Sequence, residues 1–161
     1  MIFRDKYFFL SNFYPCQLPL KIGDKVLVYQ SVEAAFQAHK NIDLADKFVN
    51  LKPLEAKKYG KHIPLTTENW NIYRLYVMAK LLNLKFKDVD LFIKLKEVKE
   101  EIVEDNYWYD EFWGVCKGKG LNMLGRLLMC IRDNNNDLNI LYNLIETELV
   151  YEIWKRMFYE K

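Results

Sequence analysis

The stretch SVEAAFQAHK, residues 31–40, decides how the rest of the chain is arranged. It predicts a helix that begins at Ser31, because a serine hydroxyl before an apolar-periodic run can accept hydrogen bonds from the free amides of the first turn. At 100° per residue, Glu33, Gln37 and Lys40 fall within one narrow arc, since their spacing is i, i+4, i+7. A separate and mostly apolar face is formed by Val32, Ala35, Phe36 and His39.

The polar arc of this helix has two interpretations. One is a solvated surface, because an acid and a base on the same helix are common. The other is a binding site, because Glu33 lies in the first turn, where the helix dipole favours an anion. Glu33 and Lys40 are about 10 Å apart along the axis at a rise of roughly 1.5 Å per residue, which leaves room for a small ligand.

The totals bound the class of protein. A length of 161 residues suggests one domain, and 51% hydrophobic with 16% aromatic residues is enough for a core and argues against disorder. The net charge of +2 comes from 24 basic and 22 acidic residues, so the composition implies no strong field for polyanions. A local phosphate site stays compatible with this balance.

The sequence contains no membrane or secretion signal and no metal pattern. It has no run of 18 apolar residues, and charged residues at 4–6 interrupt any signal-peptide core. Cys16, Cys116 and Cys130 are an odd set without C-x-x-C spacing, so we expect reduced thiols and a cytoplasmic protein. His39 and His62 lack a partner at ligand spacing and are interpreted as packed or surface histidines.

Periodicity and turn residues predict mostly helices around one hairpin. The hairpin covers residues 17–30 with a turn at 23–24, and Gly60 is expected to end a short helix as its C-cap. Thr66 or Thr67 is expected to cap a longer helix, and Asp88 the next one. The expected helices cover residues 31–40, 43–51, 55–60, 68–82, 88–100 and 122–132, with one or two more over 137–161 and a short strand over 102–106.

Two further stretches combine aromatic and polar residues. Trp108, Asp110 and Trp113 lie within six residues, as in a site that stacks a planar ring beside an acid, or as in an aromatic core where Asp110 caps a turn. Asn12 interrupts the aromatic run at 3–16, either to satisfy local backbone or to present its amide at a pocket wall. The run GKG at 118–120 matches neither a dinucleotide fingerprint nor a P-loop.

Five blocks together resemble one family. They are LSNFYPC at 10–16, SVEAAFQAHK at 31–40, PLEAKKYG at 53–60, the W-x-x-Y-R-x-x-x-M pattern at 70–78, and YWYDEFWGVCKGKGLNMLGRLLMCIR at 107–132. In this order and spacing they resemble the NADAR family, which includes the YbiA-type N-glycosidases that act on riboflavin biosynthesis intermediates. The resemblance covers about residues 3–132.

The resemblance implies a fold and an activity. The fold is α+β, a compact and predominantly helical single domain over 1–161 with a small β-hairpin or sheet, to which 133–161 would add a C-terminal helical extension. The activity is hydrolysis of the N-glycosidic bond between a nitrogen base and a phosphorylated ribose, as in ribosylamino-pyrimidine intermediates. Other members resemble hydrolases that remove ADP-ribose from guanine in nucleic acid, and a non-catalytic module that binds ADP-ribose or a nucleotide is a third class.

The family motifs fall on definite positions of this chain. The acid of the second block is Glu33 and the base that closes it is Lys40. Two positions depart from the family pattern: Tyr109 stands where glycine is usual, and Ala34 where many members have histidine. The remaining motif positions are Asn12, Trp108, Asp110, Trp113, Gly114, Gly120, Asn122 and Gly125.

The chemistry suggests roles for these residues. Glu33 and Asp110 are hypothesised as a carboxylate pair, one protonating the leaving nitrogen and one stabilising positive charge on the ribose. As a second route, Lys40 would form a Schiff base with the ring-opened sugar. The expected substrate-binding residues are Trp108 and Trp113 for stacking, Asn12, Gln37 and Asn122 for polar edges, and Arg126 or Lys119 for phosphate.

No metal or cofactor is required by either route. The expected partner is a small phosphorylated ribosylamine or an ADP-ribosyl compound, nucleic acid enters only as a modified substrate, and no membrane is involved. The sequence defines no oligomeric state.

Overall fold

The computed structural model describes residues 1–159, which form two compact units. The first unit is Ser11–Lys85. The second combines Met1–Leu10 with the chain from Phe86 onward.

A two-stranded hairpin opens the first unit. Strand β1 (Leu18–Ile22) pairs antiparallel with β2 (Lys25–Tyr29), with Leu18 opposite Tyr29. Leu18, Leu20 and Tyr29 are buried, so alternate positions of β1 face the core. The predicted hairpin is confirmed, including its two-residue turn after Ile22.

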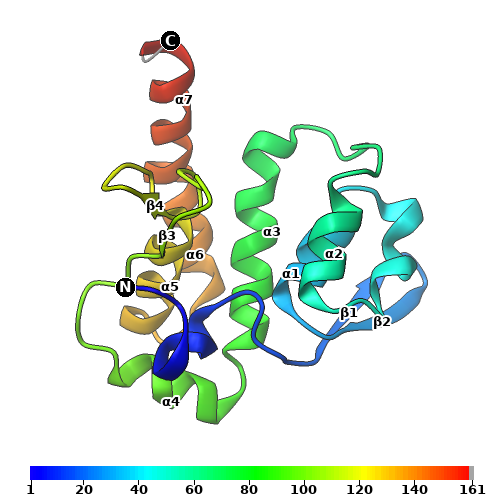
Figure 1. Ribbon diagram of the computed structural model, residues 1–161, viewed down its shortest axis with the longest axis horizontal. Coiled ribbons are helices and arrows are strands. Elements are labelled where there is room, and N and C mark those ends of the chain that lie inside the picture. The colour runs from blue at the N-terminus through cyan, green and yellow to red at the C-terminus, as the bar shows by residue number, and fades with distance from the viewer. Residues whose placement is uncertain (160–161) are drawn as a thin grey trace. The chain divides into compact units, whose positions relative to one another are not determined.

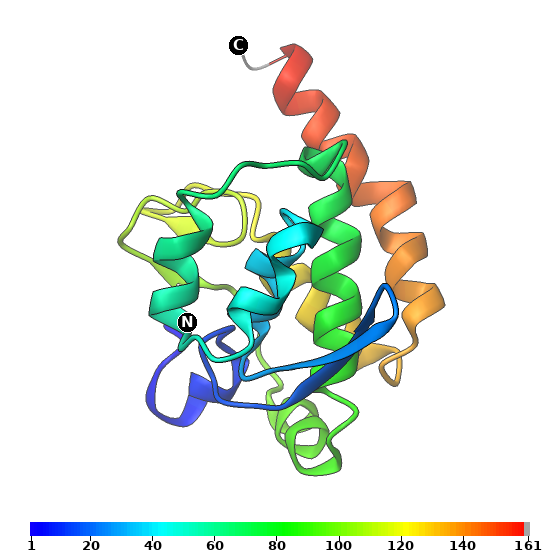
Figure 2. The ribbon, with the colours of Figure 1, turned by 90° about the vertical axis from the view of Figure 1, so that its right-hand side faces the viewer.

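Helix α1 (Val32–Ala38) occupies the middle of the first unit. It lies between α2 (Pro53–Gly60) and α3 (Trp70–Lys85) in both ribbon views (Figure 1, Figure 2). The 3₁₀ helix η2 (Ile42–Phe48) contacts it as well. Ser31 caps α1 as predicted, because its Oγ accepts a hydrogen bond from the Ala34 amide at 3.1 Å. Enclosed by three helices, every residue of α1 is buried.

Two predicted helix ends in this unit are wrong. Gly60 is the last residue of α2 and Lys61 is its C-cap. The glycine is needed for another reason: a Cβ atom there would lie 2.0 Å from Oε1 of Gln37 on α1. Neither Thr66 nor Thr67 caps α3, because that helix begins at Trp70, and the Thr67 hydroxyl donates to the His39 carbonyl at 2.5 Å.

Short elements make up most of the second unit before helix α5. A 3₁₀ helix, η1 (Asp5–Leu10), comes first, and α4 (Val89–Glu97) begins at Asp88, whose Oδ1 accepts from the Leu91 amide at 3.1 Å, as predicted. Strands β3 (Asp105–Asn106) and β4 (Val115–Cys116) then pair in parallel. Helix α5 (Met123–Asp133) contacts both α4 and α6.

The last part of the second unit is one continuous helical rod (Figure 1). It comprises α6 (Leu138–Leu144), a π-helical turn η3 (Ile145–Leu149) and α7 (Val150–Tyr159). One face is buried along the rod through Leu141, Ile145, Leu149 and Ile153. The predicted amphipathic tail is confirmed to Tyr159, and residues 160 and 161 lie outside the described part.

The predicted fold class is confirmed: the chain is predominantly helical with a small antiparallel hairpin. Within residues 1–159, no helix is both long enough and apolar enough to span a bilayer.

Candidate functional site

Glu33 is a buried acid in the first turn of α1. Glu33 is only 9% exposed, and its Oε1 accepts a hydrogen bond from Nε2 of Gln37 at 2.9 Å. Gln37 is itself 6% exposed. The polar arc of residues 33–40 is therefore not a solvated helix face. A buried carboxylate is costly to desolvate, so its retention points to a use.

Lys40 follows α1 and is half-buried. Burial lowers the pKa of its ammonium group, the negative charge of Glu33 raises it back in part, and the positive charges of Arg74 and Lys61 lower it further. One acid and two other cations thus act on the Lys40 ammonium group. The Lys40 carbonyl oxygen accepts hydrogen bonds from the amides of Thr66 and Thr67, which fixes the backbone at residue 40.

Asn12 lies at the opposite end of α1. Its backbone carbonyl accepts from the Glu33 amide at 3.0 Å, so it satisfies one of the free amides of the first turn. Its Nδ2 lies 3.7 Å from the sulfur of Met78 on α3. Within residues 1–159, two buried side-chain oxygens of this cluster, Oδ1 of Asn12 and Oε1 of Gln37, accept no hydrogen bond. Buried acceptors of this kind call for an explanation.

Lys85 was not among the predicted site residues. It ends α3 and is 2% exposed, and its Nζ donates to the Ser11 carbonyl at 2.9 Å. Burial lowers its pKa to about 7, opposed by the nearby Cys16. The sequence did contain a signal, because Lys85 continues the buried positions Leu75, Met78 and Leu82 at spacings of three and four.

Asp110 organises a loop of the second unit. Its Oδ1 accepts from the amides of Phe112 at 3.0 Å and Trp113 at 2.8 Å. Its backbone exchanges two further hydrogen bonds with the side-chain amide of Asn106. These hydrogen bonds form the capped turn that the sequence offered as one interpretation of this cluster. They hold Asp110 in one orientation.

The two tryptophans of this loop each pack edge-on against a neighbour. Trp108 is 46% exposed, and its ring centroid is 5.2 Å from that of Tyr107. Trp113 is half-buried, with its centroid 4.8 Å from that of Phe112. Tyr109, at the position where the family usually has glycine, adopts a φ of 65°, which glycine adopts without strain.

Asn122 is a buried structural amide just before α5. Its Nδ2 donates to the Ile102 carbonyl at 2.9 Å, and its Oδ1 accepts from the Glu104 amide at 3.0 Å. A Cβ atom on Gly125 would lie 2.2 Å from the same Ile102 carbonyl and 2.4 Å from the Asn122 nitrogen. Glycine at 125 therefore lets the Asn122 side chain join α5 to the preceding segment.

The two cations predicted to meet phosphate differ in their surroundings. Arg126 follows Asn122 on α5, and its Nη2 is 3.8 Å from Oε2 of Glu148 on η3. Lys119 is exposed in the tight turn after β4, where its amide donates to the Cys116 carbonyl at 3.0 Å.

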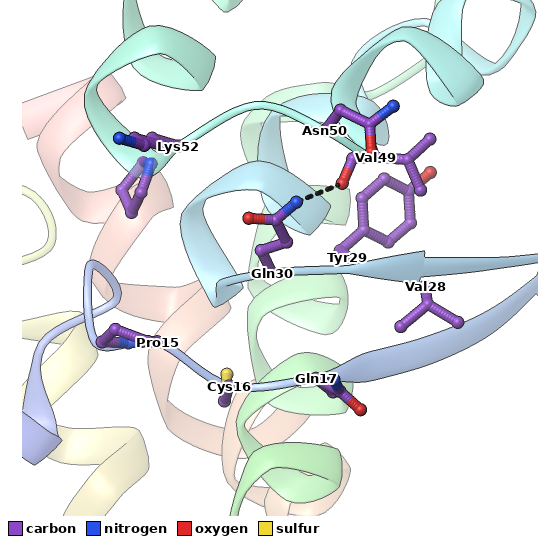
Figure 3. Close-up of a pocket in the computed structure, with 10 residues that line it drawn as sticks. Pro15, Cys16, Gln17, Val28, Tyr29, Gln30, Val49, Asn50 and Lys52 are labelled. Carbon is purple, nitrogen blue, oxygen red and sulfur yellow. Dashed lines mark hydrogen bonds between the residues drawn. The ribbon is translucent and has the colours of Figure 1, made fainter.

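A separate hollow of about 770 Å³ lies beside the hairpin in the first unit (Figure 3). In one wall, the Gln30 amide nitrogen donates to the Val49 carbonyl at 3.2 Å. None of the predicted site residues lines it, and its lining residues include no carboxylate. Its titratable side chains are those of Cys16, Tyr29 and Lys52. Its walls are formed by Pro15, Cys16, Gln17, Val28, Tyr29, Gln30, Val49, Asn50, Lys52 and Pro53.

The histidines are packed or exposed, as interpreted. His39 is buried with Nδ1 2.6 Å from the Ala35 carbonyl, and burial lowers its pKa, while His62 is exposed. In the described part of the chain, no three His, Cys, Asp or Glu side chains gather as metal ligands would.

The structure thus groups the predicted residues in two sets, one in each unit. In the first unit, Glu33 and Gln37 lie on α1, Asn12 bonds to its first turn and Lys40 follows it. In the second unit, the loop of Trp108, Asp110 and Trp113 is followed by the α5 start, with Lys119, Asn122 and Arg126.

The whole match along the chain, and not the two sets alone, shows the family. The model of the NADAR domain matches residues 2–134, and the chain belongs to this family. The match spans four-fifths of the sequence and includes every predicted site residue.

Particular relatives agree with this assignment. The chain is 31% identical over 138 residues to the N-glycosidase YbiA of Shigella sonnei, covering 80% of this chain and 82% of that protein. It is 28% identical over 151 residues to the riboflavin biosynthesis protein VVA0006 of Vibrio vulnificus, covering 88% of this chain but only 39% of that longer protein. An NMR structure of the E. coli protein YbiA matches with a TM-score of 0.69 at 28% identity, over 81% of this chain and 79% of that one.

Proposed function

We propose that this chain is an N-glycosidase that hydrolyses the bond between a nitrogen base and a phosphorylated ribose, with ribosylamino-pyrimidine intermediates of riboflavin biosynthesis as its substrates. Membership of the NADAR family supports this, as do a relative named N-glycosidase and another named riboflavin biosynthesis protein. The observation that carries the proposal is the buried Glu33, held by Gln37 between flanking helices.

Glu33 supplies the acid–base chemistry. Cleavage builds positive charge on the ribose, and the leaving nitrogen must gain a proton. A carboxyl group in a site that excludes water serves either need, because electrostatic interactions are stronger there than in water. Water then adds to the anomeric carbon, and the products are the free base and the phosphorylated sugar. The unfilled acceptor Oδ1 of Asn12 suits a hydroxyl or amino donor of such a substrate.

Asp110 is the second carboxylate that the family pattern implies. Its Oδ1 holds the loop through two backbone amides, so the proposal assigns the chemistry to Oδ2. Asp110→Asn is the informative substitution, because it removes the charge and keeps the Oδ1 acceptor. Loss of turnover without loss of folding supports the role, and unchanged turnover contradicts it.

Lys40 provides the second route. Its lowered pKa increases the fraction of neutral amine, which can attack the ring-opened sugar imine and expel the base. Water then hydrolyses the Schiff base and regenerates the amine. Borohydride treatment during turnover tests this directly: a stable adduct on Lys40 supports covalency, and its absence leaves the carboxylate route.

The phosphate of the substrate has two candidate positions. The positive charges of Lys61 and Arg74 act on Lys40, and this repulsion would be relieved by a bound anion. Lys119 and Arg126 were predicted from the sequence. Lys61 and Lys119 are both exposed, so Lys61→Met and Lys119→Met are a matched pair of substitutions. The substitution that raises KM at unchanged kcat identifies which group of cations binds the phosphate.

A substrate panel tests the function as a whole. The purified chain is incubated with ribosylaminouracil phosphate, ADP-ribosylated guanosine and NAD, and the released base is measured by chromatography. Release from the ribosylamine at the highest kcat/KM supports the proposal. Preferential release from the guanosine compound indicates an ADP-ribosyl hydrolase, and binding without release indicates a non-catalytic module.

A further inference from the structure

A buried lysine holds the turn that presents Asn12. Lys85 is 2% exposed at the end of α3, and its Nζ lies 2.9 Å from the Ser11 carbonyl oxygen. The same oxygen accepts from the Tyr14 amide at 3.1 Å, which closes the turn formed by residues 11–14. The Ser11 hydroxyl also accepts from the Phe13 amide at 3.1 Å. Both the backbone and the side chain of Ser11 therefore fix this turn.

The turn is joined to the start of α1. Asn12, its second residue, accepts the Glu33 amide on its backbone carbonyl at 3.0 Å. Its side chain contacts Met78 on α3, and its Oδ1 is one of the two buried acceptors described above. A displacement of the turn would move this oxygen and remove the hydrogen bond that fixes the backbone of Glu33.

We infer that Lys85 is a positioning residue for N-glycoside hydrolysis, which holds the turn of residues 11–14 so that the Asn12 amide stands beside Glu33. This inference rests on the proposed function and adds to it a residue that touches no substrate. A methionine or leucine would fill the same apolar space at lower cost, because a buried ammonium group loses its hydration. The hydrogen bond to Ser11 gives the chain a reason to keep the charge.

The surroundings make this bond dependent on pH. The Tyr14 ring lies 5.5 Å from Nζ, and the Cys16 thiol is the titratable group whose charge acts on Lys85. Burial lowers the lysine pKa to about 7, so the ammonium form is lost within the working range of most enzymes. A protonated amine donates a stronger hydrogen bond to a carbonyl than a neutral amine does.

Lys85→Met tests the inference, with Lys80→Met as its control. Methionine keeps an unbranched side chain and removes the donor, and it is expected to fold because it removes a buried charge. Lys80 lies on the same helix and is exposed. Two measurements are made on both variants: steady-state kinetics on the ribosylamine from pH 6 to 9, and hydrogen exchange of the Tyr14 and Glu33 amides.

We expect Lys85→Met to raise KM about tenfold, because it removes one charge-assisted hydrogen bond, while kcat changes much less. KM of the wild type should rise above about pH 7, and this rise should be missing in Lys85→Met. The two amides should exchange faster in Lys85→Met only. Unchanged exchange together with wild-type KM would overturn the inference. A wild-type chain that releases no base refutes the proposed function instead, and the exchange measurement then decides alone whether Lys85 holds the turn.

Discussion

Glu33 shows how a single residue is prepared by its neighbours. Its amide donates to the Asn12 carbonyl, and its carboxylate accepts from the Gln37 side chain. Its negative charge raises the pKa of Lys40. These contacts keep one carboxylate in one orientation away from water, which is what a reacting acid requires.

Tyr109 is a residue at which the cost of a left-handed backbone can be measured. Its φ of 65° is unfavourable for residues with a Cβ atom, and its side chain is 72% exposed. Tyr109→Gly and Tyr109→Ala both lose the ring and its contact with Lys117, so their difference isolates the backbone. We expect the glycine variant to be more stable by about 1 kcal/mol, which reverses the usual order of these residues.

Thermal or urea unfolding of the two variants measures this difference. An alanine variant at least as stable as the glycine variant would show that the backbone at position 109 carries no strain.

The sequence predicted individual residues unevenly. The cap at Ser31, the cap at Asp88 and the turn at Asp110 are short-range features, and the structure contains all three. Lys85 was missed because its role depends on Ser11, 74 positions earlier in the chain. Hydrogen bonds of this range leave no periodic pattern, so only a charge on an apolar helix face signals them.

At the scale of elements, α1 differs most from its prediction. The pattern of residues 31–40 predicted one apolar and one polar face, yet all of α1 is buried. Helical periodicity reports which residues share a face but not what covers that face. Here α2 covers the side that carries Gln37, and this requires the close approach at Gly60.

Gly60→Ala tests this packing. The new Cβ would collide with the Gln37 amide at 2.0 Å, so we expect a loss of about 1–3 kcal/mol in unfolding free energy. Lys58→Ala, at an exposed position of the same helix, should change stability by less than about 0.5 kcal/mol.

The double variant with Gln37→Ala identifies the cause. If the collision is responsible, the two substitutions are non-additive, and Gly60→Ala costs much less in the Gln37→Ala background. Strict additivity would mean that Gly60 matters for another reason.

At the scale of the whole molecule, the family match covers both compact units. The fold class, the hairpin and most helices were predictable, because they follow from local periodicity and turn residues. The division into two units was not, since Met1–Leu10 joins the second unit from the other end of the chain. The N-terminal amine makes this connection with the Val103 carbonyl at 2.8 Å and with Asp105 at 2.6 Å.

The unfolding free energy should depend on pH because the Lys85 ammonium group is buried. Its pKa is near 10.5 in the unfolded chain and about 7 in the folded one, so the unfolded chain binds more protons between these values. The unfolding free energy should therefore rise with pH from about 7 to 9.5, by at most about 1.4 kcal/mol per pH unit.

Urea unfolding at several pH values measures the slope, and Lys85→Met should lack this contribution. The window ends below the titration of Tyr29, whose pKa burial raises to about 12. Equal slopes in wild type and Lys85→Met would show that Lys85 titrates normally in the folded chain.

The central claim is that the buried carboxylate of Glu33 performs the chemistry. The most direct measurement is kcat for base release from ribosylaminouracil phosphate by Glu33→Gln, which keeps the acceptor for Gln37 and removes the charge, beside the exposed control Glu68→Gln. We predict a fall of about 10²–10⁴-fold for Glu33→Gln with an unchanged unfolding midpoint, and wild-type turnover for Glu68→Gln. A folded Glu33→Gln variant with wild-type kcat would contradict the account.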